Sequence, residues 1–281
     1  MSFNGVINIY KPAGITSHGV VSRVRRILGM KKVGHTGTLD PDADGVLPIC
    51  VGKGTKLSEM LMNKDKTYVA VVKLGVATDT QDSSGNILEI REVTADKEAI
   101  LDVIMGFVGQ IEQVPPMYSA IKIGGRKLYE LARQGLEVER KARNVTIYSI
   151  DVNNISNDSV TITVDCSKGT YIRTLCHDIG EKLGCGAHME KLTRTRAGKF
   201  DIKDSVTLEE LSGNHIINID EFFDEYEKII VTGENLYRVL NGADINVSKS
   251  DGKYRLYDED GNFLSVSMVE NGGLKLVKAF W

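Results

Sequence analysis

The order of strand-like and helix-like segments constrains the fold of this chain more than any other feature. Runs of β-branched or alternating apolar residues predict strands at 6–10, 68–76, 87–90, 146–152 and 160–166. Apolar residues at helical spacing predict helices at about 97–108, 126–134 and 170–183, and one that begins at Thr16 or Ser17 and ends at Gly29. Because strands and helices do not alternate strictly, we predict an α+β fold rather than a doubly wound parallel sheet.

The C-terminal end of the chain has a different pattern. Short strand candidates at 229–231, 254–257, 263–268 and 274–278 are separated by glycine and aspartate turns, which is typical of a small all-β module. We therefore predict two domains, a large one over residues 1–228 and a small one over residues 229–281.

Composition and the N-terminal residues bear on the cellular compartment. Hydrophobic residues make up 42% of the 281 residues and charged residues 26%, which is ordinary for a globular protein. No apolar run is long enough to span a bilayer, and the first residues lack a basic stretch followed by an apolar core. The four cysteines show no CxxC spacing, so reduced thiols are expected. We expect a cytoplasmic protein without membrane contact.

Charge is distributed unevenly, although the net charge is only −3. Six basic residues and no acid lie between Lys11 and Leu39, whereas eight acids and no lysine or arginine lie between Asp204 and Glu227. A phosphate backbone responds to a local basic patch rather than to the net charge. On charge alone, however, two solvated surface regions are the simpler interpretation.

Residues 30–47 are rich in glycine, threonine, aspartate and proline, and we interpret them as a long loop. Gly34 and Gly37 permit tight turns and close approach of a ligand to the backbone. Pro41 restricts Asp40 to extended conformations, which keeps this aspartate out of a helix. A carboxylate on a glycine-rich loop is a candidate nucleophile or base.

The sequence contains two candidate metal sites, and neither has the spacing that a metal site requires. Asp40, Asp42 and Asp44 resemble the start of an EF-hand, but the twelfth position, which needs a glutamate, is Val51. The zinc candidates are Cys176, His177, Cys185 and His188. Adjacent residues of a helix diverge by about 100°, so Cys176 and His177 are poor joint ligands, and we expect no metal.

Several spaced motifs resemble those of the tRNA pseudouridine-55 synthases of the TruB type. They occur in family order, from residue 8 to about residue 200, at 8–17, 34–41, 45–50, 66–68, 167–174 and 184–192. The module at 229–281 resembles the small RNA-binding PUA barrel of that family through Leu240, Asn241 and Gly242. The resemblance implies a mixed, mostly antiparallel sheet with flanking helices and a C-terminal PUA-like module.

The resemblance also implies an activity and a partner. Family members cleave the bond between C1′ and N1 of uridine 55 in the T loop of tRNA, turn the base and rejoin it through C5, without metal or cofactor. The expected partner of this chain is therefore the T arm of tRNA. No obligatory protein partner is expected, and we expect a monomer.

The motifs place three catalytic residues. Asp40 matches the essential nucleophilic aspartate, which attacks C1′ or C6 or otherwise stabilises the intermediate. Burial raises the pKa of a carboxylate, and a nearby opposite charge lowers it. Arg173, at the head of a helix, is the candidate to keep Asp40 ionised and oriented. Tyr68 matches a tyrosine that stacks on the uracil and is a candidate general base, whereas its position alone would suggest a core residue.

Four further positions are expected to bind substrate. His35 matches a residue beside the flipped base, and Tyr171 and Leu192 match residues that line the uracil pocket. Lys11 belongs to the first motif and to the basic stretch. The family's RNA-clamping insert matches residues 117–143, although an ordinary surface hairpin and helix explain that segment equally well.

Two other functions stay open at this stage. The first is the same reaction on another RNA, because substrate choice depends on loops. The second is a non-catalytic RNA-binding or RNA-folding protein, against which the joint presence of Asp40, Tyr68 and Arg173 argues. Asp42 and Asp44 add negative charge where family members are often less acidic, which should weaken RNA binding slightly.

Overall fold

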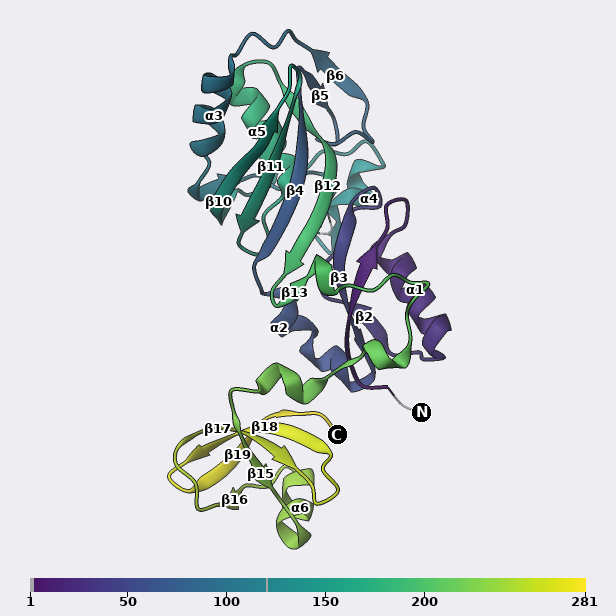
Figure 1. Ribbon diagram of the computed structural model, residues 1–281, viewed down its shortest axis with the longest axis vertical. Helices are drawn as coiled ribbons and strands as arrows, with labels where there is room; N and C mark the ends of the chain where they lie inside the picture. Colours follow the sequence, from purple (N-terminus) through teal and green to yellow (C-terminus); the bar gives the residue numbers. More distant parts are fainter. Residues whose placement is uncertain (1–2, 120) are drawn as a thin grey trace.

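The computed structural model describes residues 3–119 and 121–281. It consists of a large twisted sheet with helices along it and a smaller five-stranded sheet at the C-terminal end (Figure 1). No helix in the described residues is long and apolar enough to cross a membrane.

The large sheet contains ten strands. Eight of them follow the order β14-β1-β3-β12-β4-β11-β10-β7, while β13 pairs with β12 and β2 pairs with β3. The strand bounds are β1 Gly5–Lys11, β2 Val33–His35, β3 Asp44–Val51, β4 Lys66–Leu74, β7 Gly109–Gln113, β10 Arg143–Ile155, β11 Ser159–Cys166, β12 Ala187–Ala197, β13 Phe200–Asp201 and β14 Ile217–Asn218. The β3–β12 pair is parallel and the other pairs are antiparallel. The prediction of a mixed, mostly antiparallel sheet is therefore confirmed.

Helices α3 (Lys97–Met105) and α5 (Ile172–Leu183) lie against one face of this sheet (Figure 1). The alternating burial of β4 follows from that packing, because every second side chain enters a core shared with both helices. Helix α1 (Ser17–Leu28) packs beside β2 and β3. As predicted, Thr16 caps α1 by accepting from the Gly19 amide at 2.9 Å, and the helix ends at Gly29 with φ 63°.

Smaller elements connect the sheet and helices. They are α2 Ser58–Met62, α4 Leu128–Ala132, the hairpins β5 Val76–Thr78 with β6 Ile87–Ile90 and β8 Lys122–Ile123 with β9 Arg126–Lys127, and the 3₁₀ turns Gly52–Leu57, Ile202–Asp204, Gly213–His215 and Ile219–Phe223.

The long loop predicted at 30–47 is shorter than expected, because β2 and the start of β3 lie within it. Pro48 stands inside β3, opposite Asn8 of β1, where a proline would ordinarily argue against a central strand. Gly45 has φ +106°, and a Cβ atom there would lie 2.2 Å from the Arg194 carbonyl oxygen. Only glycine therefore permits the close parallel pairing of β3 with β12.

The C-terminal sheet has the order β15-β17-β18-β19-β16. Its strands are β15 Glu227–Ile230, β16 Ile245–Asn246, β17 Gly252–Tyr257, β18 Phe263–Glu270 and β19 Gly273–Ala279. A helix that the sequence pattern did not indicate, α6 (Gly233–Leu240), packs against this sheet through Val239. The fold class with a PUA-like module is otherwise as predicted.

An aromatic seam joins this module to the large domain. The rings of Phe223, Phe263 and Phe280 lie 5.3–6.1 Å apart, centroid to centroid. The Tyr257 hydroxyl donates to a carboxylate oxygen of Asp220 at 2.7 Å across the same boundary. The two sheets are thus held together by a packed interface rather than by a bare linker.

Candidate active site

Asp40 lies on the loop 36–43 between β2 and β3, where its side chain is 36% exposed. The buried Ser17 hydroxyl donates to the Leu39 carbonyl at 3.0 Å and accepts from the Leu39 amide at 2.8 Å. Beyond the aspartate, the Gly14 amide donates to the Pro41 carbonyl at 2.9 Å. Both sides of Asp40 are therefore tied to the first helix of the chain and to the turn before it.

Arg173 pairs with Asp40, as the sequence predicted. It is the second residue of α5, and its Nε lies 3.1 Å from Asp40 Oδ2 while Nη2 lies 3.5 Å from Oδ1. The same guanidinium donates to the Tyr118 carbonyl at 2.7 Å and lies 3.4 Å from a carboxylate oxygen of Asp82. A buried arginine fork with several acceptors has a fixed orientation, so Asp40 faces a fixed partner.

The pKa of Asp40 is raised above its ordinary value of 3.8, chiefly because burial disfavours the carboxylate. Arg173 opposes that rise most strongly, and Lys11 opposes it as well, whereas the negative charges of Asp82 and Asp42 add to it. The ion pair with Arg173 therefore reduces the rise in pKa without cancelling it.

Lys11, one of the residues predicted to bind substrate, lies inside the protein. It is fully buried, and its ammonium donates to the carbonyls of Pro12, Pro41 and Ala43 at 3.0, 2.9 and 2.6 Å. Burial lowers its pKa to about 8. A lysine before a proline at a strand end suggests a surface residue, but here it links the strand to the Asp40 loop.

The residue before Asp40 packs into the apolar core of the large sheet. Tyr68 of β4 and Leu192 of β12 are buried in the same cluster as Leu39, the residue before Asp40. Burial raises the pKa of the Tyr68 hydroxyl, while the nearby Arg194 guanidinium opposes the rise. Tyr68 is close enough to Asp40 for the negative charge of the carboxylate to add to that rise. Leu192 stands opposite Ala70 on β4, two residues from Tyr68.

Tyr171 and His35 lie at the edges of this region. Tyr171 immediately precedes α5, and the Gln113 side chain holds it by hydrogen bonds of 3.0 and 3.2 Å to its backbone amide and carbonyl. Half-buried His35 ends β2, and its Nδ1 accepts from the Gly37 amide at 3.3 Å. Burial lowers the pKa of His35, and Arg194 adds to this effect.

Sequence reasoning missed Asp82 and Arg194. Asp82 is ion-paired with Arg173, and its carboxylate accepts a hydrogen bond of 2.7 Å from the Thr80 hydroxyl. Arg194 is 2% exposed and donates to the carbonyls of Val46 and Gly37. An arginine in an alternating strand ordinarily faces solvent, so its pattern carried no signal of burial.

The metal candidates have other contacts in the structure. Cys176 is fully buried in the core, and His188 Nδ1 lies 2.8 Å from the Val76 carbonyl oxygen. Within residues 3–119 and 121–281, no group of three or more His, Cys, Asp or Glu side chains is arranged to hold a metal ion.

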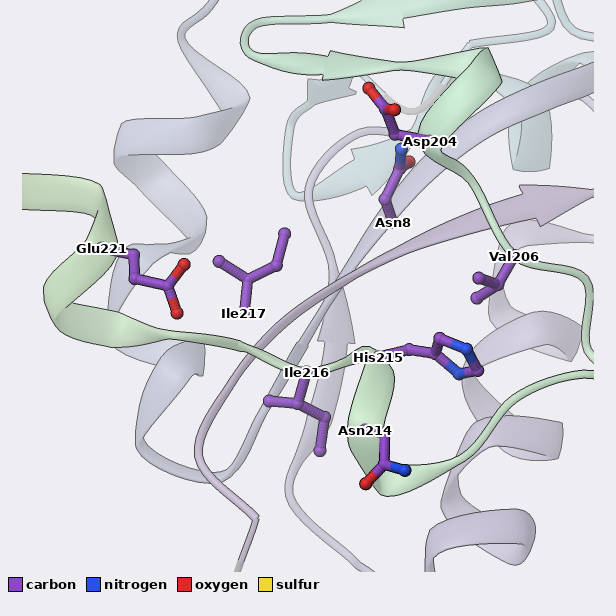
Figure 2. Close-up of a pocket in the computed structure, with 8 residues that line it drawn as sticks. All are labelled: Asn8, Asp204, Val206, Asn214, His215, Ile216, Ile217 and Glu221. Carbon is purple, nitrogen blue, oxygen red and sulfur yellow. The ribbon is translucent and has the colours of Figure 1, made fainter.

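A cavity of about 340 Å³ lies apart from the Asp40 loop (Figure 2). Its walls come from β1 and from the acidic run, and include Asn8, His215 and Glu221. None of the residues expected to act in catalysis or substrate binding lines this cavity.

Two basic surfaces lie on other parts of the large domain. Arg23, Arg26, Lys31 and Lys32 are exposed on α1 and just after it. The second is on residues 121–141 of the predicted insert, hereafter called the insert, where Lys122 and Arg126 are exposed. This segment carries the β8–β9 hairpin and α4, and buried Leu128 and Leu131 anchor it.

Comparison with known proteins gives the chain a family context. Residues 25–172 match the model of the TruB family pseudouridylate synthase N-terminal domain, and residues 173–245 match the tRNA pseudouridylate synthase B C-terminal domain. Proteins named tRNA pseudouridine synthase B are 47% identical in Clostridium kluyveri, over 99% of both chains, and 48% identical in Clostridium perfringens, over 98% of both.

Solved structures give the same picture of the fold. The chain is similar to one in a Cbf5-Nop10-Gar1 complex, with a TM-score of 0.70 and 27% identity over 99% of this chain and 85% of that one. A chain in an H/ACA RNP bound to a substrate RNA containing 2′-deoxyuridine gives a TM-score of 0.68 and 26% identity, covering 99% of this chain and 85% of that one.

Proposed function

The chain belongs to the TruB family of pseudouridylate synthases, and we propose that it isomerises uridine 55 in the T loop of tRNA to pseudouridine. The reaction breaks the C1′–N1 bond and joins C1′ to C5. C5 gives up its proton and N1 takes up one, so the product is an isomer of the substrate and no oxidant is consumed. One observation carries the proposal for this site: Asp40 is paired with buried Arg173 on a tethered loop, and its neighbour Leu39 is buried in the same cluster as Tyr68 and Leu192.

Asp40 acts as the nucleophilic carboxylate. Its partial exposure leaves it accessible to a ribose or a base brought to the loop, while Arg173 orients it. When RNA covers the site, water is excluded and the carboxylate is desolvated further, which favours its neutral form. The guanidinium opposes that change, so Arg173 keeps Asp40 ionised at the time of attack.

The flipped uracil binds in a pocket lined by Tyr68, Leu192 and Tyr171. Unstacking a base costs a few kcal/mol, and stacking on an aromatic ring offsets part of that cost. Tyr68 supplies the ring, and its hydroxyl is a candidate to accept the C5 proton. His35 borders the loop from the other side, next to the flipped nucleotide.

RNA binding relies on the exposed basic residues of α1 and of the insert. These side chains neutralise phosphates of the T arm, so affinity is expected to fall as salt is added. Residues 1–228 form the catalytic domain and residues 229–281 the RNA-binding module in this proposal. We expect a cytoplasmic monomer that acts without an obligatory protein partner, metal or cofactor.

The decisive experiment measures pseudouridine at each position of an unmodified tRNA transcript, with EDTA present. Product confined to the T-loop uridine supports enzyme and substrate together. A matched transcript with cytidine at that position is the control. Tight binding without product would favour an RNA-binding protein, and product only on a ribosomal RNA hairpin would favour the same reaction on another RNA.

A further inference from the structure

Arg194 of β12 is the bulkiest fully buried side chain in the described part of the chain. Buried guanidinium groups are ordinarily paired with carboxylates, because desolvating an isolated charge is costly. Within residues 3–119 and 121–281, no ion pair joins Arg194 to an acidic side chain. Its hydrogen-bond partners are instead backbone carbonyls. The role of this buried cation therefore depends on the segments that contain those carbonyls.

The two carbonyls lie on either side of the catalytic candidate. Arg194 Nε donates to Val46 at 2.7 Å, in the strand after the loop, and Nη2 donates to Gly37 at 3.2 Å, three residues before Asp40. The planar fork of an arginine can donate in two fixed directions at once, which lysine cannot do. One side chain therefore fixes both ends of the segment that carries Asp40.

The third neighbour of the guanidinium is Tyr68. Arg194 and Tyr68 stand opposite each other in the β12–β4 ladder. The positive charge of the guanidinium works against the rise in the pKa of the tyrosine hydroxyl that burial causes. The same positive charge lowers the pKa of His35, so its field extends to the loop side of the site.

We propose that Arg194 is a positioning residue for the isomerisation, which fixes the loop carrying Asp40 relative to the ring and hydroxyl of Tyr68. This inference rests on the proposed function, because it assigns distinct roles to those two side chains. Misplacing a reacting group by about 1 Å can lower a rate by about 10²-fold. Arg194 acts through the residues that it holds and does not need to contact the RNA.

The test compares Arg194→Gln with Arg196→Gln, a matched control on the same strand. Arg196 is half-exposed and paired with Asp165, away from the Asp40 loop. We expect Arg194→Gln to lower the single-turnover rate on T-arm RNA about 10²-fold and to change the RNA dissociation constant less than about threefold. Arg196→Gln should keep the rate within about threefold of wild type.

Two further measurements separate positioning from a purely structural role. The chain has five histidines, so NMR titration can follow His35, whose pKa should rise in Arg194→Gln because a positive neighbour is removed. Arg194→Lys keeps the charge but loses the fork, so its rate should fall about tenfold while the pKa of His35 stays near that of wild type. If Arg194→Gln does not fold, this lysine variant carries the test.

The outcomes distinguish the claims. A rate within threefold of wild type in the glutamine variant, or in the lysine variant where the glutamine variant does not fold, would overturn the positioning role. So would a fall in rate that only parallels a loss of folded protein or of RNA affinity. A wild-type enzyme without activity on this RNA contradicts the proposed function instead, while the NMR titration still reports whether Arg194 acts on the loop.

Discussion

The Asp40 loop and the insert at 121–141 are held in opposite ways. The loop is tied by the buried side chains of Lys11, Ser17 and Arg194, which bind its backbone groups. The insert has a two-residue hairpin ladder, and most of its polar side chains are exposed. Its anchors are two leucines and the Tyr118 carbonyl at its root.

The difference separates two tasks of an RNA-modifying enzyme. A nucleophile must be held within a fraction of an ångström, which requires a loop that does not open. A segment that grips RNA has to adapt to it, and segments with few buried contacts open at low free energy. We therefore expect changes in the loop to alter the rate and changes in the insert to alter affinity.

The largest effect is expected from Asp40→Asn, which should lower the single-turnover rate by at least about 10⁴-fold, because removing a nucleophile removes the chemical route. RNA affinity, measured by filter binding, should stay within a few-fold. Asp42→Asn is the matched control, since Asp42 is an exposed carboxylate two residues along the same loop. A large loss of affinity in Asp40→Asn would make this aspartate structural.

Arg173→Lys should lower the same rate about 10²-fold. The ammonium keeps the charge but cannot bind Asp40, Asp82 and the Tyr118 carbonyl together. Affinity for RNA should change little, because the guanidinium is buried. An unchanged rate with lysine would show that charge alone is enough and that the fork does not orient Asp40.

The insert should behave in the opposite way. Replacing exposed Lys122 and Arg126 by glutamine should weaken RNA binding about tenfold and leave the rate at saturating RNA unchanged. The slope of affinity against salt should fall by about 1 for each phosphate contact that is lost. Lys97→Gln, at the start of α3, is the control. A fall in the rate at saturating RNA would contradict the proposal that the insert acts on affinity alone.

The smallest effect concerns pH. Because the pKa of Asp40 is raised, kcat/KM should fall on acidification at a pH above the ordinary aspartate value of 3.8. Asp82→Asn removes a negative charge that raises this pKa, so the acidic limb should move to lower pH. Asp42→Asn should move it in the same direction but less. A limb that stays in place in Asp82→Asn would show that another group titrates.

Much of this arrangement could be predicted from sequence, where local pattern and local structure agree. Gly29 ended α1 as expected, and the Asp40 and Arg173 motifs pointed to residues that the fold brings together. The sequence pattern did not predict features that depend on tertiary contacts. The burial of Lys11 and Arg194 depends on carbonyls from distant segments, and no local rule places a cation there.

The strand β3 shows the same limit. The glycine, threonine, aspartate and proline content of residues 30–47 predicted a loop, but β1, β2 and β12 all pair with β3, which begins at Asp44. Asp82 was missed for a similar reason, because its role depends on a contact with Arg173, which is 91 residues away in the sequence.

The aromatic seam has a consequence for the solution behaviour of shortened forms of the chain. Phe223 and Phe280 are almost fully buried, and their mutual cover comes from opposite sides of the boundary between the two sheets. A chain cut at residue 228 would present Phe223 and its neighbours to water as a contiguous apolar patch. Such a fragment would tend to self-associate. Loss of activity in the fragment would then result from aggregation and would not show that the missing module takes part in catalysis.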